Sequence, residues 1–166
     1  VLINERDGTE QVFYKGLESV RTDWTELAKT FQADLFNLVF HDRDPSPLVK
    51  QVVEDTATGK LDHMLVYRKQ LRRKLSAYVK NVPPHVRAAR LADEHNRALG
   101  KSLRYQNKGW ISYVMTTSGP EPVEYLTSPI DYDHYIDRQL KPVADGILPF
   151  IGLQFDAVAS AQEALF

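Results

Sequence analysis

Apolar residues recur at helical spacing from Trp24 to Phe40, and polar residues fill the positions between them. A repeat of three to four residues gathers side chains on one face of a helix, so this stretch predicts a long amphipathic helix. Asp23 is its expected N-cap, with Glu26 at the capping-box position. The chain therefore contains at least one helix with a face to bury.

Shorter patterns lie on either side of this helix. Residues 1–14 form two runs rich in β-branched and aromatic residues around Asp7-Gly8, a combination that predicts a two-stranded hairpin. After the long helix, Ser46 with Pro47 at the first helical position predicts a second helix that stops at Gly59.

The middle of the chain predicts two further helices. Residues 65–67 are β-prone, and from there Leu71, Leu75 and Tyr78 recur at helical spacing until Val82-Pro83-Pro84 ends the pattern. In that helix, the basic residues of the segment would share the face opposite the apolar one. Pro84 then opens another helix, which is expected to run to about residue 99.

The periodicity changes after Gly109. Residues 110–115 predict a strand that pairs with residues 123–126 across Gly119-Pro120. A last helix is expected from Asp131 to about Ile147, interrupted by Pro142, and the helical signal fades after residue 152. These elements predict an α+β fold that is mainly helical, with an N-terminal β-hairpin and a small β element near residues 109–126.

Composition limits the class of protein. With 166 residues, of which 43% are apolar, the chain can bury a core of its own. It contains no long apolar run that predicts a membrane span or a signal peptide, so no membrane partner is expected. The absence of cysteine excludes disulfides and thiolate chemistry and fits a reducing compartment, which favours a cytoplasmic location.

The charge is distributed very unevenly. Residues 1–66 hold 7 Lys and Arg against 12 Asp and Glu, residues 67–108 hold 12 against 2, and residues 109–166 hold 2 against 8. The local net charges are therefore −5, +10 and −6 within a chain of net charge −1. Residues 67–90 contain no acidic residue at all, whereas a merely solvated helix usually mixes both signs. This asymmetry favours a polyanionic partner such as nucleic acid.

Two functional alternatives follow from the residues alone. A stand-alone, non-enzymatic nucleic-acid-binding protein would explain the basic segment equally well. A small metal-dependent phosphoesterase could use His85, Asp131, Asp133 and His134, although these residues lack a recognised metal-binding spacing.

Four segments, in order, resemble the C-terminal part of the family-B DNA polymerases, within them the bacterial DNA polymerase II branch. They are YKGLESVRTDW (residues 14–24), QLRRKLSAYVKNVPPHVRAARLA (residues 70–92), GWISYV (residues 109–114) and IDYDHYIDRQLKPVADGIL (residues 130–148). The resemblance implies a palm-derived hairpin over residues 1–16 and a helical thumb domain over residues 17–158 that grips duplex DNA. It also implies a clamp-binding tail over residues 159–166.

The resemblance implies that the catalytic carboxylates of the polymerase lie upstream of this segment. We therefore expect no catalytic residue, no metal ligand and no cofactor in the fragment, and Mg²⁺ in the parent polymerase. Asp131 and Asp133 stand at the start of a predicted helix, where interaction with the helix dipole explains them without a metal.

The expected partners are primer-template duplex DNA, the palm and exonuclease domains of the parent chain, and the bacterial sliding clamp. Tyr67, Tyr78 and Tyr105 are expected in the core rather than as base-stacking residues. The residues QEALF at positions 162–166 resemble the peptide by which bacterial polymerases bind the clamp, through Gln162, Leu165 and Phe166. The expected DNA-binding residues are Lys15, Arg21, Arg68, Lys69, Arg72, Arg73, Lys74, Lys80, His85, Arg87 and Arg90.

Overall fold

The computed structural model describes residues 2–6, 9–13 and 24–160. Its elements fall into two units, the first formed by residues 1–54 and 137–166 and the second by residues 55–136. The fold is mainly helical with a small antiparallel sheet, which confirms the predicted α+β class.

The N-terminal residues form the predicted hairpin. Strands β1 (Leu2–Arg6) and β2 (Thr9–Phe13) are antiparallel, with Leu2 opposite Phe13 and Arg6 opposite Thr9. The predicted turn residues 7–8 lie outside the described residues.

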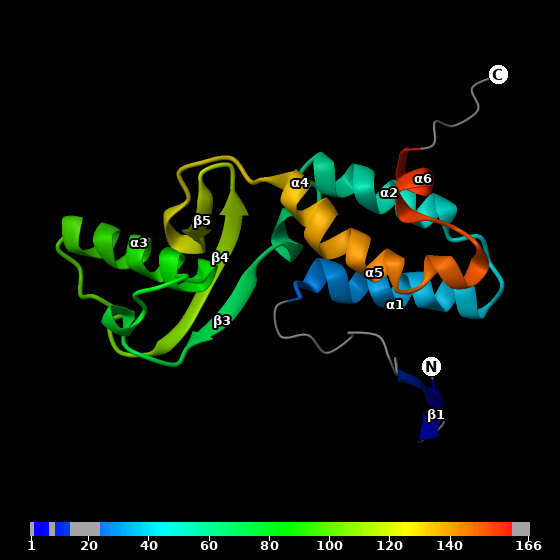
Figure 1. The fold of residues 1–166 in the computed structure, drawn as a ribbon, viewed down its shortest axis with the longest axis horizontal. Coiled ribbons are helices and arrows are strands. Elements are labelled where there is room, and N and C mark those ends of the chain that lie inside the picture. Colours follow the sequence, from blue (N-terminus) through cyan, green and yellow to red (C-terminus); the bar gives the residue numbers. More distant parts are fainter. Residues whose placement is uncertain (1, 7–8, 14–23, 161–166) are drawn as a thin grey trace. The chain divides into compact units, whose positions relative to one another are not determined.

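Apart from the β1–β2 hairpin, the described part of the first unit is helical (Figure 1). It contains α1 (Glu26–Phe40), most of α2 (Ser46–Ala57), α5 (Lys141–Asp145) and α6 (Phe155–Ser160). Helix α1 packs on α5, and the apolar core of this unit is almost completely buried. These buried side chains include Leu27, Phe31, Leu35, Leu140, Val143 and Leu148.

The start of α1 differs from the predicted one. Thr25 is the N-cap, not Asp23, and its hydroxyl oxygen accepts a hydrogen bond from the amide of Ala28. The amide and hydroxyl of Thr25 both donate to Oε1 of the buried Gln139, at 3.0 and 2.9 Å. The N-cap of this helix is therefore held by Gln139, a residue 114 positions further along the chain.

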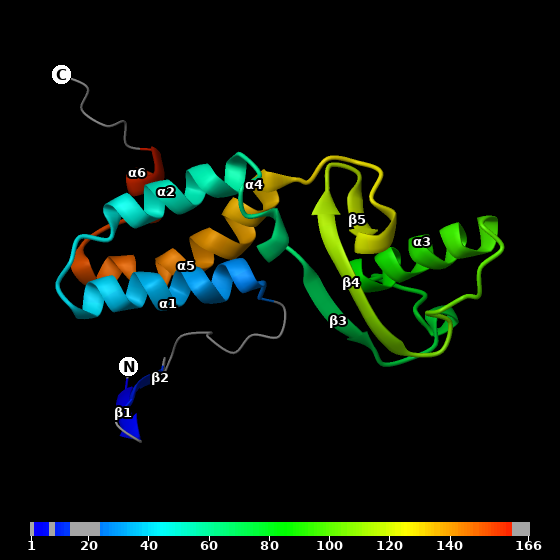
Figure 2. The same ribbon diagram turned by 180° about the vertical axis from the view of Figure 1, so that it is seen from behind.

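The second unit is a three-stranded sheet with one helix packed against it. Strands β3 (Tyr67–Leu71), β4 (Gly109–Thr116) and β5 (Gly119–Pro122) are antiparallel in the order β3-β4-β5. Helix α3 (Pro84–Ala98) lies along the sheet (Figure 2) and contacts all three strands. Its residues Ala88, Ala89 and Ala92 are fully buried, because small side chains allow the helix to approach the sheet closely.

The helix predicted to follow the β-prone residues 65–67 and to end at Val82-Pro83-Pro84 is wrong. Residues 67–71 form strand β3, and only a short 3-10 turn follows at Leu75–Ala77. The spacing of Tyr67 and Leu71 fits both structures, since residues four apart share a face in a helix and in a strand. Pairing with β4, in which Tyr67 lies opposite Tyr113 and Leu71 opposite Gly109, decides between them.

The second strand of the predicted β element is also misplaced. Pairing with β4 begins at Gly119, and residues 123–125 form a 3-10 turn. Gly119 has a φ of 102°, which favours glycine, and its carbonyl accepts a hydrogen bond from the Thr116 hydroxyl at 2.8 Å. The chain therefore turns within residues 117–118 and starts the strand earlier than predicted.

The C-terminal helix is interrupted as predicted. A π-helical segment (Ile136–Leu140) separates α4 (Tyr132–Tyr135) from α5, just before Pro142, which lacks the amide hydrogen that a continuous helix needs. The predicted fading of helix after residue 152 is wrong, because α6 forms there. Phe155 and Val158, three residues apart, are buried as α6 packs on α5.

Candidate nucleic-acid interface

Strand β3 carries the first part of the basic surface. Arg68, Lys69 and Gln70 are exposed, whereas Tyr67 and Leu71 at its ends are buried. In the three-stranded sheet, β3 is an edge strand, since only β4 pairs with it among the described residues. Charged side chains on an edge strand oppose pairing with another chain. Arg68 and Lys69 also form the start of a row of solvent-exposed cations.

The loop after β3 extends this row. Arg72, Arg73, Lys74 and Lys80 are all exposed. The guanidinium of Arg73 lies 4.5 Å from the ring centroid of Tyr78, and the Tyr78 hydroxyl oxygen accepts a hydrogen bond from the Arg72 amide at 3.3 Å. The buried Tyr78 therefore fixes the backbone that presents these cations.

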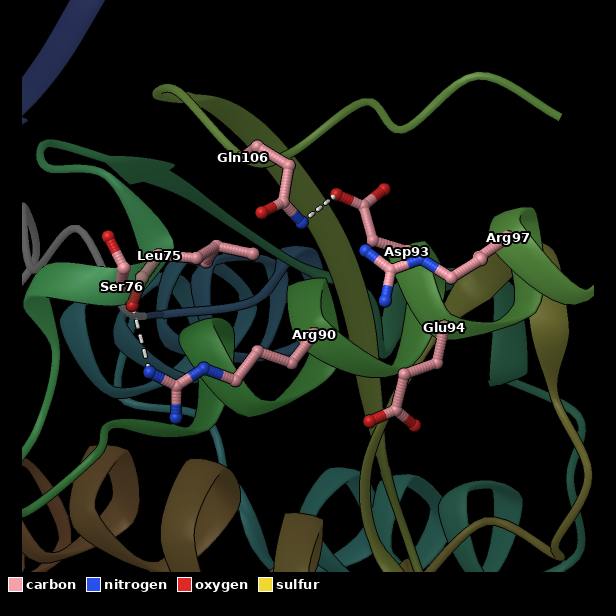
Figure 3. Close-up of a pocket in the computed structure, with 7 residues that line it drawn as sticks. All are labelled: Leu75, Ser76, Arg90, Asp93, Glu94, Arg97 and Gln106. Atoms are coloured by element: carbon pink, nitrogen blue, oxygen red, sulfur yellow. Dashed lines mark hydrogen bonds between the residues drawn. The ribbon is translucent and has the colours of Figure 1, made fainter.

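Arg90 holds the same loop from α3. Its Nη2 donates to the carbonyl oxygens of Leu75 and Tyr78 at 2.8 and 2.6 Å. Figure 3 shows this guanidinium reaching from the helix toward Leu75 and Ser76. Since these bonds occupy part of a half-buried guanidinium, Arg90 shapes the loop in addition to supplying charge.

Asp93 anchors a second loop against α3. Asp93 is only 3% exposed. It accepts hydrogen bonds from the amides of Arg104 and Tyr105 and from the side chains of Asn96 and Gln106. Burial alone would raise the pKa of Asp93, but these four hydrogen bonds together hold that pKa below its ordinary value. Figure 3 shows Gln106 directed at this carboxylate.

The two loops are joined. The amide of Leu75 donates to the carbonyl oxygen of Gln106 at 3.1 Å. Asp93 therefore holds Gln106, and Gln106 holds the start of the 3-10 turn that follows Arg72, Arg73 and Lys74. A single buried carboxylate thus supports the position of a cationic loop.

His85 and Arg87 stand at the first turn of α3. His85 is 6% exposed, and its ring meets Tyr78 edge to face at 6.2 Å between centroids. Burial, and secondarily the charge of Lys69, lowers the pKa of His85, so its ring is neutral at pH 7. Arg87 is exposed, and its guanidinium lies beside Gly119, where an added Cβ would come within 3.1 Å of Nη2.

The tyrosines occupy the core, as predicted. Tyr67, Tyr78 and Tyr105 are all buried. Tyr105 donates a hydrogen bond to Glu124 Oε1 at 2.7 Å, and burial together with that bond raises the pKa of Tyr105 to about 12. These rings organise the unit and are not free to stack on a ligand.

Two of the residues considered for metal chemistry, Asp131 and His134, have structural roles. Asp131 is the N-cap of α4 and accepts a hydrogen bond from the His134 amide at 3.2 Å. His134 Nε2 lies 2.8 Å from the Tyr67 hydroxyl. Residues 2–6, 9–13 and 24–160 contain no group of three His, Cys, Asp or Glu residues that could hold a metal ion. No helix within those ranges is long and apolar enough to cross a membrane.

Five of the predicted site residues cannot be placed. Lys15 and Arg21 lie outside the described residues, as do the tail residues Gln162, Leu165 and Phe166.

The sequence pattern does not reveal the roles of two further residues, one exposed and one buried. Trp110 falls within a predicted strand, but it is exposed and lies under Arg68, whose guanidinium is 4.4 Å from the ring centroid. Asp93 carries no motif. An acidic residue directly after the long acid-free segment was the only available signal of its role.

The fold agrees with that of a solved relative, and the sequence matches a known family over most of its length. The profile described as DNA polymerase family B matches residues 1–150, and the chain therefore belongs to the family B DNA polymerases.

Among individual relatives, DNA polymerase II of Escherichia coli (strain K12) is 54% identical over 165 residues, which cover 99% of this chain and 21% of that protein. DNA polymerase 2 of Aeropyrum pernix is 30% identical and is matched over 83% of this chain and 18% of its own length. The solved structure of the family B DNA polymerase from Pyrobaculum calidifontis superposes with a TM-score of 0.61 at 26% identity, covering 80% of this chain and 18% of that one. The chain thus spans about a fifth of the length of these relatives.

Proposed function

We propose that this chain is the thumb region of a bacterial DNA-directed DNA polymerase and holds primer-template duplex DNA by contacts to its backbone. The observation that carries the proposal is the cationic surface formed by β3 and the loop that follows it. Residues 63–92 contain no Asp or Glu, and six of their Lys and Arg side chains are exposed on β3 and this loop. The six are Arg68, Lys69, Arg72, Arg73, Lys74 and Lys80.

The chemistry of this surface suits phosphate contacts rather than base reading. Cations on an edge strand and a loop can follow a charged backbone, and contacts of this kind fix position without reading sequence. Arg87, at the first turn of α3, adds a cation. His85 and Arg90, which were expected to contact DNA, act in this proposal mainly by fixing the loop. Lys15 and Arg21 would contribute from outside the described residues.

Reversal of Arg72, Arg73 and Lys74 to Glu tests this proposal. With about six phosphates neutralised, the logarithm of the affinity should fall with the logarithm of salt concentration with a slope of roughly −5. The triple variant should lose most of its duplex affinity and show a shallower slope. Fluorescence anisotropy of labelled duplexes of unrelated sequence measures both quantities and should reveal little sequence preference.

Lys29, Arg43 and Arg138 provide a matched control. All three are exposed, and all lie in the first unit. Their reversal to Glu changes the net charge by the same amount as the test variant. Equal loss of affinity in the two triple variants would show that duplex affinity depends on the net charge of the protein and not on this surface.

Polymerase activity in this proposal belongs to the parent enzyme, at the bacterial nucleoid in the cytoplasm. The described residues offer no carboxylate cluster that fits Mg²⁺. We therefore assign no step of nucleotidyl transfer to them, and the palm domain of the parent chain would supply the metal site. The palm and exonuclease domains are the expected intramolecular partners.

We further propose the sliding clamp as a partner, on the sequence pattern QEALF at residues 162–166. Burial of Leu165 and Phe166 in a clamp pocket would contribute roughly 1.5–3 kcal/mol each, which the ordering of a short segment partly offsets. Calorimetry against purified bacterial clamp should show binding of micromolar order. Changing Leu165 and Phe166 to Ala should remove clamp binding and leave duplex affinity unchanged, and equal clamp binding by both proteins would place the contact elsewhere.

A further inference from the structure

An exposed tryptophan lies on the open face of the three-stranded sheet. Trp110, near the start of β4, is 50% exposed. In the sheet register it lies opposite Gln70, and the alternating neighbours Leu71 and Ile111 are buried. Successive residues of a strand point to opposite faces of the sheet. Leu71 and Ile111 point to the buried face, so Trp110 lies on the opposite face.

Arg68 shares this open face with Trp110. Its guanidinium carbon lies 4.4 Å from the centroid of the indole ring, in the geometry of a cation–π contact. At a solvent-exposed site such a contact stabilises the fold only weakly. Fold stability therefore does not account for a large aromatic side chain left half in water.

The two strands that carry this pair lie in acid-free parts of the sequence. Residues 63–92, which include β3, and residues 95–120, which include β4, contain no Asp or Glu. Lys69 and Lys108 flank the pair in sequence and are exposed. The cations of such a surface attract the phosphates of an anionic chain. The indole ring adds a flat stacking surface, which a phosphate contact does not use.

The base is the part of a nucleic acid that an indole ring suits. In a duplex, each base is covered on both faces by its neighbours, so a protein ring finds no base face to stack on. Single-stranded segments expose base faces, and proteins bind them through aromatic side chains combined with cations along the backbone. The combination of Trp110, Arg68 and acid-free strands fits an unpaired nucleotide.

We propose that Trp110, with Arg68 stacked on its ring, binds an unpaired base of single-stranded DNA. This inference rests on the proposed DNA-binding function and adds a single-stranded segment to the duplex as a ligand of the same basic surface. The sheet face would then bind a strand emerging from the duplex, while the loop cations bind paired backbone.

Tryptophan fluorescence tests the stacking directly. The chain has two tryptophans, and the other one, Trp24, is only 6% exposed. Titration with an oligothymidylate of about 16 nucleotides should quench the emission of Trp110. The Trp24→Phe variant should retain the quenching, and Trp110→Phe should lose it. Unchanged emission at saturating oligonucleotide would overturn the proposal.

Binding assays separate this proposal from the duplex-binding one. Trp110→Leu should weaken oligothymidylate binding by roughly 5- to 150-fold, the range expected for one lost base stack, and should leave duplex affinity within about twofold. Trp110→Phe should restore part of the loss, because it keeps an aromatic face. Arg68→Lys, which keeps the charge and removes the flat guanidinium, should also weaken single-strand binding.

The control variant is Leu126→Ala, which removes another exposed apolar side chain of the same unit. It should bind both ligands normally, and circular dichroism should show that every variant is folded. Normal single-strand binding by Trp110→Leu refutes the stacking role even if duplex binding is confirmed. An equal loss of affinity for single-stranded and duplex DNA in Trp110→Leu also refutes the stacking role. If the basic surface does not bind DNA at all, the reversal of Arg72, Arg73 and Lys74 will show this separately, as unchanged duplex affinity.

Discussion

Replacement of Asp93 by Asn should destabilise the second unit strongly although it changes few atoms. The two carboxylate oxygens each accept two hydrogen bonds, at 2.8–3.2 Å. In Asp93→Asn, one oxygen becomes an amide group that faces two donors, so two bonds are lost and two donors remain unsatisfied. A hydrogen bond to a charged group contributes about 1.5–3 kcal/mol, which gives about 3–6 kcal/mol for two.

The lower end of this range should apply. Arg104 and Gln106, which supply two of the donors, are exposed, so water can replace part of what is lost. We therefore expect a loss of about 3 kcal/mol in the free energy of unfolding. With a urea m value of roughly 1–1.5 kcal/mol/M, the midpoint should fall by about 2–3 M. Emission of Trp110 in a Trp24→Phe background reports on this unit alone.

The pH dependence provides a second measurement of the same carboxylate. Its pKa is lowered in the folded state, so the unfolded state binds the proton more readily and ionised Asp93 stabilises the fold above the ordinary value of 3.8. This stabilisation is lost as the pH falls below 3.8 through the folded pKa. The difference between the wild type and Asp93→Asn should therefore narrow in acid.

Glu94→Gln is the matched control, since it removes the same charge from the neighbouring, exposed position of α3. It should change stability by less than about 0.5 kcal/mol. Duplex affinity should fall in Asp93→Asn even under conditions where the protein is folded, because Gln106 and the basic loop lose their anchor. A destabilisation of Asp93→Asn no larger than that of Glu94→Gln would refute the anchoring role.

Three further outcomes are expected. Arg90→Lys keeps the charge but loses the pair of bonds to Leu75 and Tyr78, so it should weaken duplex binding and speed amide exchange in residues 72–80; exchange rates equal to the wild type would contradict this. Because the pKa of His85 is lowered in the folded state, the wild type should lose stability as the pH falls from 7 to 5. The His85→Gln variant should lose less stability over this range, and parallel profiles of urea midpoint against pH would contradict this prediction. Gln139→Ala removes the partner of Thr25 and should destabilise the first unit by about 1–3 kcal/mol in thermal denaturation, whereas Arg138→Ala on the exposed side should not.

The sequence alone determined the elements whose periodicity has one interpretation. Helix α1 repeats over four turns and cannot be a strand, and Pro84 at the start of α3 fixes both the beginning and the type of that helix. Gly59 ends α2 with a φ of 83°, as a glycine at that position predicts. Charge is additive along the chain, so the concentration of positive charge in residues 67–108 was also predictable without coordinates.

Only the tertiary structure decided where that charge is displayed. The residues after Tyr67 fit a helix and a strand equally well, and hydrogen bonds to β4, about forty residues away, select the strand. The roles of Asp93, Arg90 and Trp110 depend on neighbours brought together by that pairing and by the packing of α3. Local sequence cannot specify them, because a hydrogen bond or a ring contact depends on distance in space and not on spacing along the chain.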